Sequence, residues 1–139
     1  MPLVEISLIK GKSRDYIRSI ADSIHQALHE SYNVPVNDRF QLIRQFEPED
    51  LIYDPNYLGV HRSNDIVIVH IVAGRWRDTA TKKGFYKRAV DLLSQKPGVR
   101  PEDVQIILSP NDRDDWSFGN GTASYLNDSS APPPPENSD

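Results

Sequence analysis

The chain contains an internal repeat, and this repeat limits the folds that it can adopt. The sequence GKSRD at residues 11–15 returns as GRWRD at 74–78, and each copy follows an apolar run. Farther along, VPVND at 34–38 is matched by VRPED at 99–103. Similar pieces in the same order indicate two copies of one supersecondary unit; chance similarity between two ordinary units is the alternative.

The first unit is predicted to be strand, helix and strand over residues 3–46. LVEISLI, 3–9, alternates in part and is rich in branched side chains, which is typical of a strand. Ser13 can cap a helix over 14–32, in which apolar residues recur on one face. RFQLIRQF, 39–46, follows as the closing strand.

The second unit repeats this order over residues 65–109. DIVIVHIVA, 65–73, is the strongest strand signal in the chain, and its continuous apolar character indicates burial on both faces. A helix is expected from about 78 to 94, and VQIIL, 104–108, is the fourth strand.

Two such units predict an α/β (α+β) fold with one four-stranded sheet and both helices on one face. Each strand–helix–strand unit forms a parallel pair with a right-handed crossover. The other face of the sheet has no element of the chain to cover it, so copies of the chain are expected to do so, as a homo-oligomer. We assign one domain to residues 1–126, with repeats at about 2–46 and 65–109. The proline-rich, acidic tail, 127–139, is expected to be disordered.

Composition excludes several classes of function. A formal net charge of −4 argues against nucleic acid as the main partner, and the absence of cysteine excludes disulfides and thiolate chemistry. No apolar run is long enough to span a bilayer, and the N-terminus lacks the pattern of a signal peptide, so a cytoplasmic location without membrane attachment is expected.

Four short motifs, in this order, resemble the tautomerase superfamily and, within it, the malonate semialdehyde decarboxylases. They are MPL at the start, DRFQ at 38–41, RWR at 75–77 and DWSFG at 115–119. The resemblance covers about residues 2–126. It implies a homotrimer of tandem β-α-β subunits that needs neither a cofactor nor a metal ion and acts on a small oxo acid.

The resemblance also implies a role for each matched side chain. Pro2 would become the N-terminal residue once Met1 is removed, and its secondary amine would be catalytic. Arg75 and Arg77 would hold the carboxylate of the substrate, and Asp38 would assist the amine or position a water molecule. The ring pair would form an apolar wall over the site: Trp116 and Phe118.

The residues themselves support this chemistry but leave alternatives open. A free α-amino group titrates close to neutral pH, so Pro2 can act as base, cation or nucleophile; otherwise it merely begins a strand. If the backbone stays extended, Arg75 and Arg77 point to the same face and can grip a carboxylate together. Otherwise they pair with the nearby Asp15 and Asp78. Alternatively, Asp38 is a turn residue. Trp116 and Phe118 could equally fill the core or form an oligomer contact.

Three histidines are weaker candidates. His25 and His29 have a spacing that can bind a metal ion, but no third ligand is nearby in the sequence, so no metal site is predicted. His70, within the strand at 65–73, is interpreted as a hydrogen-bonded core histidine.

The favoured function is cofactor-independent decarboxylation of a small 3-oxo acid such as malonate semialdehyde. A tautomerase or hydratase of 2-oxo acids, of the phenylpyruvate type with Pro2 as general base, is the alternative enzyme. An oligomeric binding module without catalysis is the alternative from another class.

Overall fold

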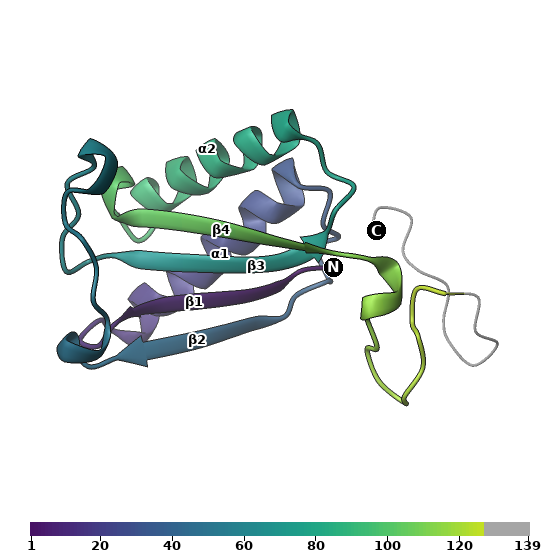
Figure 1. The fold of residues 1–139 in the computed structure, drawn as a ribbon. Helices are drawn as coiled ribbons and strands as arrows, with labels where there is room; N and C mark the ends of the chain where they lie inside the picture. The colour runs from purple at the N-terminus through teal and green to yellow at the C-terminus, as the bar shows by residue number, and fades with distance from the viewer. Residues whose placement is uncertain (127–139) are drawn as a thin grey trace.

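Four strands form one mixed sheet in the order β2–β1–β3–β4 (Figure 1). The strands are β1 Leu3–Ile9, β2 Gln41–Phe46, β3 Val67–Gly74 and β4 Val104–Asn111. Within each unit the two strands are parallel, and the central pair, β1 and β3, is antiparallel. This computed structural model describes residues 1–126, so the predicted tail lies outside the described residues.

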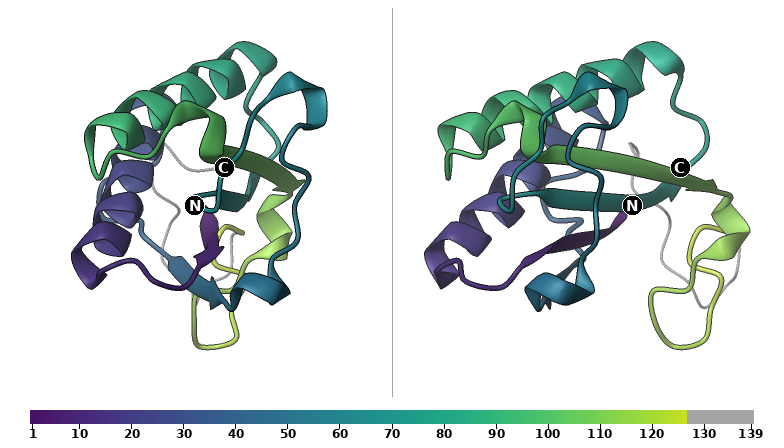
Figure 2. Two further views of the ribbon diagram at one scale, coloured as in Figure 1. Left: turned by 90° about the vertical axis from the view of Figure 1, so that its left-hand side faces the viewer. Right: turned by 60° about the vertical axis from the view of Figure 1, so that its left-hand side comes forward.

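Both helices cover the same face of the sheet, as two further views show (Figure 2). They are α1 Arg14–Ser31 and α2 Thr79–Gln95. Each begins at a capping side chain: Ser13 accepts a hydrogen bond from the third residue after it, and Asp78 does the same for α2. The predicted tandem β-α-β architecture, with four strands and two helices, is therefore confirmed.

The hydrophobic core lies between this face and the helices. Every second residue of β1 and β3 points into it and is almost completely buried, which is the period of a pleated strand. The largest core side chains include Tyr32 at the end of α1 and Phe85 on α2, whose ring centroids lie 5.2 Å apart. This aromatic contact joins the two repeats at one end of the helical layer.

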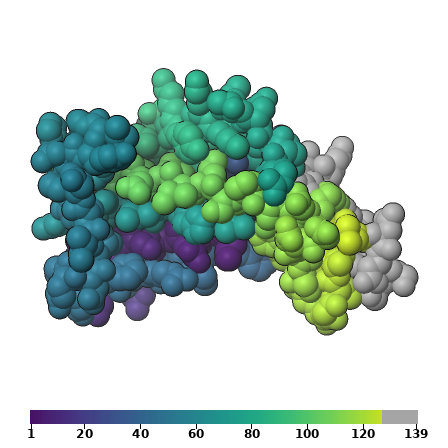
Figure 3. Space-filling model, in the orientation of Figure 1, coloured from purple at the N-terminus to yellow at the C-terminus, as the bar shows by residue number. Residues whose placement is uncertain are grey.

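The opposite face of the sheet is covered only in part by residues 1–126: where β2 ends, Leu51 and Tyr53 of the following loop pack with Phe46 and Ile68. Elsewhere on this face Leu42 and Ile107 are 45% and 44% exposed, and atoms of all four strands are visible in Figure 3. His70 also lies on this face and is half-buried, so the prediction that it belongs to the core is wrong. It is nevertheless hydrogen-bonded, since Nδ1 lies 3.2 Å from Glu5 Oε2 and Nε2 lies 2.7 Å from Ser109 Oγ.

Strand ends differ from the sequence expectation by a few residues. The second strand begins at Gln41 rather than at 39, and β4 continues past 108 to Asn111. Pro110 is tolerated within β4 because this strand is at the edge of the sheet, where a missing N–H removes no ladder bond. Among the described residues, no helix is long and apolar enough to cross a membrane.

The strands begin and finish at two opposite ends of the sheet. β1 and β2 begin, and β3 and β4 finish, at one of these ends, which we call the site edge to distinguish it from the edge strands β2 and β4. The loop between β2 and β3 lies at the other end and contains two 3₁₀ turns, η1 Pro48–Asp50 and η2 Tyr57–Gly59. In Figure 1 the site edge is on the right, next to the chain terminus marked N.

Candidate active site

All of the side chains proposed from the sequence come from segments that meet at the site edge. Pro2 directly precedes β1, and Asp38 precedes β2. Arg75 and Arg77 follow β3, and the aromatic pair follows β4 after a short 3₁₀ turn, η4 Arg113–Asp115. The fold therefore brings together, from four separate parts of the chain, the six predicted residues: Pro2, Asp38, Arg75, Arg77, Trp116 and Phe118.

The start of the chain is buried against a carboxylate. The amino nitrogen of Met1 lies 2.8 Å from Asp38 Oδ2, and the Asp38 side chain is only 11% exposed. Met1 and Pro2 are both buried. An ion pair in such a shielded position is screened little by solvent.

Arg75 is held at the surface of the site edge. Its side chain is 58% exposed, and its Nε donates a hydrogen bond of 2.7 Å to Asp112 Oδ1 at the end of β4. This hydrogen bond raises the pKa of the Arg75 guanidinium above its usual value. Because the side chain is largely exposed, the other N–H donors of the guanidinium are accessible to an anion from solution.

Arg77 has a different environment from Arg75. It is 2% exposed, and its guanidinium carbon lies 4.3 Å from the ring centroids of both Tyr32 and Trp76. Nε donates to the Tyr32 carbonyl at 3.0 Å and Nη1 to the Gly74 carbonyl at 3.3 Å. The two arginines are not equivalent because β3 ends at Gly74 and the chain then turns, so the condition of an extended backbone is not met.

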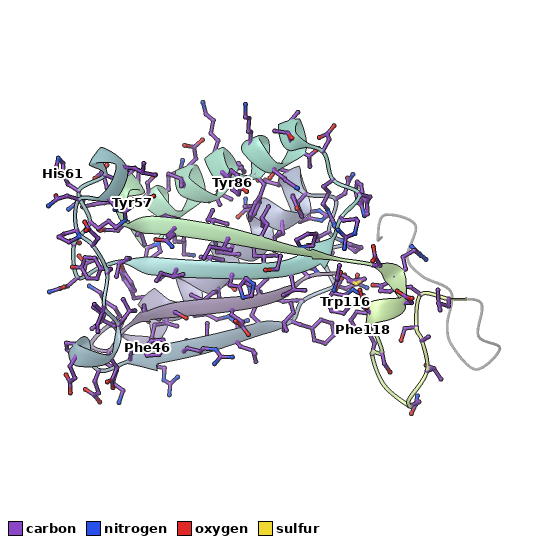
Figure 4. The ribbon with its side chains drawn as sticks, in the orientation of Figure 1. Phe46, Tyr57, His61, Tyr86, Trp116 and Phe118 are labelled. Atoms are coloured by element: carbon purple, nitrogen blue, oxygen red, sulfur yellow. The ribbon has the colours of Figure 1, made fainter. Side chains whose placement is uncertain are left out.

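The aromatic pair stacks beside the start of β1. Trp116 and Phe118 are parallel within 5°, with centroids 5.3 Å apart, and both lie at the site edge in Figure 4. Phe118 also contacts Phe40 at 5.6 Å, and the Phe40 carbonyl accepts a hydrogen bond from the N–H of Val4. The rings thus lie next to Phe40, whose backbone pairs with the start of β1.

Sequence reasoning missed two residues that shape this edge. Phe40 stands two positions after Asp38, but a phenylalanine before an apolar strand carries no signal that it faces the C-terminal segment. Asp112, the partner of Arg75, lies in NDRDD, where several acids compete for that pairing. The pairings with Asp15 and Asp78 that the sequence allowed are not the contacts described here, since Asp78 instead caps α2.

Three exposed carboxylates gather in the same segment. Oxygen atoms of Asp112, Asp114 and Asp115 lie within 4.8 Å of one another. Asp112 is engaged by Arg75, and Asp115 accepts a hydrogen bond from the N–H of Asp112, so these acids already hold η4 in place. Their arrangement is explained by local structure and does not by itself define a metal site.

Comparison with known proteins identifies the family. Two models of the tautomerase enzyme family match the chain, one over residues 2–61 and the other over residues 38–119. A curated relative, probable tautomerase YusQ of Bacillus subtilis strain 168, is 40% identical over 126 residues, which are 91% of this chain and 99% of the relative. The chain belongs to the tautomerase family.

Two solved structures are similar to it over most of their length. Malonate semialdehyde decarboxylase, in a study of its decarboxylase and hydratase activities, is 34% identical, with a TM-score of 0.83, and the match covers 88% of this chain and 94% of that one. FG41 malonate semialdehyde decarboxylase inhibited by 3-bromopropiolate is 37% identical, also with a TM-score of 0.83, covering 88% and 93%. The expected resemblance to this superfamily, with malonate semialdehyde decarboxylases among the nearest structures, is therefore confirmed.

Proposed function

We propose that the protein is a cofactor-independent decarboxylase of small 3-oxo acids such as malonate semialdehyde, with Pro2 as its catalytic group. The observation that carries the proposal is the buried pairing of the chain-start nitrogen with Asp38 at 2.8 Å. Once Met1 is removed, the nitrogen of Pro2 is one residue along the chain from that position and is a secondary amine. A carboxylate beside it favours its protonated form, which can polarise a carbonyl oxygen.

The arginines hold the substrate carboxylate in this proposal. Arg75 is the first ligand, because its exposed guanidinium can reach an anion while Asp112 fixes its orientation. Arg77 supports the site with its charge, and it also fixes the turn that carries Arg75, through the carbonyl of Gly74. Holding the carboxylate with its C–C bond perpendicular to the carbonyl plane removes much of the orientational part of the barrier.

Water is the only further reagent that the reaction needs. The C–C bond to the carboxylate breaks and CO2 leaves; the electron pair of that bond forms the C=C bond of an enol, while the carbonyl π pair moves onto oxygen, which takes a proton from the Pro2 ammonium. Water then protonates the enol carbon and leaves as hydroxide, while the enol O–H returns its proton to Pro2 as the carbonyl re-forms. Trp116 and Phe118 limit the access of water to this step.

A second candidate is a tautomerase or hydratase of 2-oxo acids, with Pro2 as general base. The name of the curated relative favours it, and the same amine and arginines serve either reaction. For either function we propose a homotrimer, in which copies of the chain cover the open face of the sheet; the exposed Leu42 and Ile107 support this.

One assay separates the two candidates. The purified protein is supplied with malonate semialdehyde and, in parallel, with phenylpyruvate, and CO2 release is compared with enol–keto exchange. We expect CO2 release that is abolished in Pro2→Ala and reduced in Arg75→Met. Exchange without CO2 release would establish the tautomerase, and full turnover by folded Pro2→Ala would reject both.

A further inference from the structure

One stripe of α1 contacts the segment that carries Asp38. Residues at positions 22, 25 and 29 are three and four apart, so they lie on the same face of the helix. All three side chains make hydrogen bonds to residues of the segment 34–39, which connects α1 to β2. The proposed chemistry does not use this stripe directly, and the stripe accounts for the two histidines that have the spacing of a metal site.

The histidine contacts are to backbone carbonyls. His25 Nε2 lies 2.7 Å from the carbonyl oxygen of Val36, and His29 Nδ1 lies 2.8 Å from that of Val34. A carbonyl oxygen only accepts, so in each ring the nitrogen concerned carries the hydrogen. The carbonyl between them, that of Pro35, accepts the N–H of Asp38 at 3.0 Å, so the turn leading to Asp38 is fixed along its length.

The third contact of the stripe is weaker. Arg39 Nη2 lies 2.7 Å from Asp22 Oδ1, but the Asp22 side chain is 49% exposed, and surface ion pairs contribute little. His25, in contrast, is buried, so its hydrogen bond is protected from water and its loss would leave the Val36 carbonyl without this donor. Of the three side chains, His25 therefore contributes most to fixing the segment 34–39, and His29 adds a second hydrogen bond.

We infer that His25 is a positioning residue for Asp38 and thereby sets the protonation of the N-terminal amine. The inference rests on the proposed function, in which that amine is catalytic. His25 does not touch the amine; it holds the backbone two residues before Asp38, and Asp38 faces the nitrogen of Met1, next to which the Pro2 amine lies in the chain. If the segment moves, the carboxylate moves from the amine, and the protonated form of the amine loses the charge that favours it.

The other charged groups near this path are few among residues 1–126. Arg39 adjoins Asp38 and is paired with Asp22, while Arg75 and Arg77 follow β3 at the same edge. Arg39 lies in the segment that His25 holds and would move with Asp38, whereas Arg75 and Arg77 lie outside that segment. A shift in the protonation of the amine after a change at His25 therefore reports the position of the segment, and comparison with Asp38→Asn assigns the part that is due to Asp38.

The test uses four single variants of the full chain. His25→Leu removes the donor, and His25→Asn carries an amide too short to reach Val36, which keeps the test possible if the leucine variant does not fold. His25→Gln places an amide N–H near the position of Nε2 and is the conservative variant. His61→Leu is the matched control, because His61 also uses a ring nitrogen for one hydrogen bond, to Asn56, but in the loop at the far end.

The first readout is independent of turnover. Modification of the N-terminal amine by an amine-reactive ester is followed by intact mass as a function of pH, since only the neutral amine reacts. In His25→Leu and His25→Asn the pH of half-maximal modification should move down, in the direction of Asp38→Asn. His25→Gln and His61→Leu should match the wild type.

The second readout is a double-mutant cycle on kcat/KM. His25→Leu should lower kcat/KM roughly 10- to 100-fold in the wild type, mostly in kcat, because misplaced groups cost rate rather than carboxylate binding. In an Asp38→Asn background the same change should have little further effect. A merely structural histidine would give the same loss in both backgrounds and no shift of the modification curve, and either result would overturn the inference. If no oxo acid is turned over, the proposed function fails while the modification curve still decides the role of His25.

Discussion

The two arginines of the site edge should differ sharply in their contribution to stability. In Arg77→Met, two ring contacts at 4.3 Å are lost: one with the buried Tyr32 ring, worth about 1–2 kcal/mol, and one with the half-exposed Trp76 ring, worth about 0.5–1 kcal/mol. The carbonyls of Tyr32 and Gly74 also lose a charged donor, at a cost of about 1–3 kcal/mol together. We therefore expect Arg77→Met to lower the free energy of unfolding by about 3–6 kcal/mol.

The matched control is Arg75→Met. Both members of the pair between Arg75 and Asp112 are 58% exposed, so the loss of this pair should lower the free energy of unfolding far less than the loss of Arg77. Urea unfolding of the variants and the wild type, at one protomer concentration, measures both changes. The reasoning would be refuted if Arg77→Met stayed within about 0.5 kcal/mol of the wild type or if Arg75→Met were the more damaging change.

Three further changes test the account elsewhere in the fold. Ser13→Ala removes the cap of α1 and should cost about 1 kcal/mol in urea unfolding. A hydrogen bond with His70 lowers the pKa of Glu5 below 4.5, so Glu5 stabilises the fold above that pH and the benefit is lost as pH falls through its lowered pKa. The unfolding free energies of Glu5→Gln and the wild type should thus differ at neutral pH and converge in acid. A difference between these two free energies that grows as the pH falls would contradict this expectation. Phe118→Ala removes a ring that stacks on Trp116 and packs at a tilt against Phe40, and it should cost about 1–3 kcal/mol, measured in the same way.

The fold could be predicted from the sequence because the repeated motifs and the strand and helix patterns all indicate the same two units. The repeated motifs mark equivalent turns, and strand and helix patterns follow each of them in the same order. A strand–helix–strand unit leaves few ways to pair, so four strands and two helices follow almost directly. Pro110 shows the limit: proline argues for the end of a strand, but only the position of β4 at the sheet edge makes its continuation possible.

The candidate site was predictable as a set of residues but not as a geometry. Short motifs identify Pro2, Asp38 and the arginines, yet nothing in RWR indicates that the first arginine is exposed and the second buried. That difference arises because the chain turns after Gly74 and meets the end of α1, a contact between residues far apart in sequence. His25 was likewise visible only as one half of a metal-like spacing, since its partner is a backbone carbonyl.

The central claim is that the secondary amine of Pro2 is free and acts beside Asp38. Intact-mass measurement of the protein isolated under native conditions tests it most directly. The account predicts a mass that lacks Met1, with any single-site label from an amine-reactive ester at low pH located on Pro2. A mass that retains Met1 in active protein would contradict it, because the nitrogen of Pro2 would then be an amide without basicity.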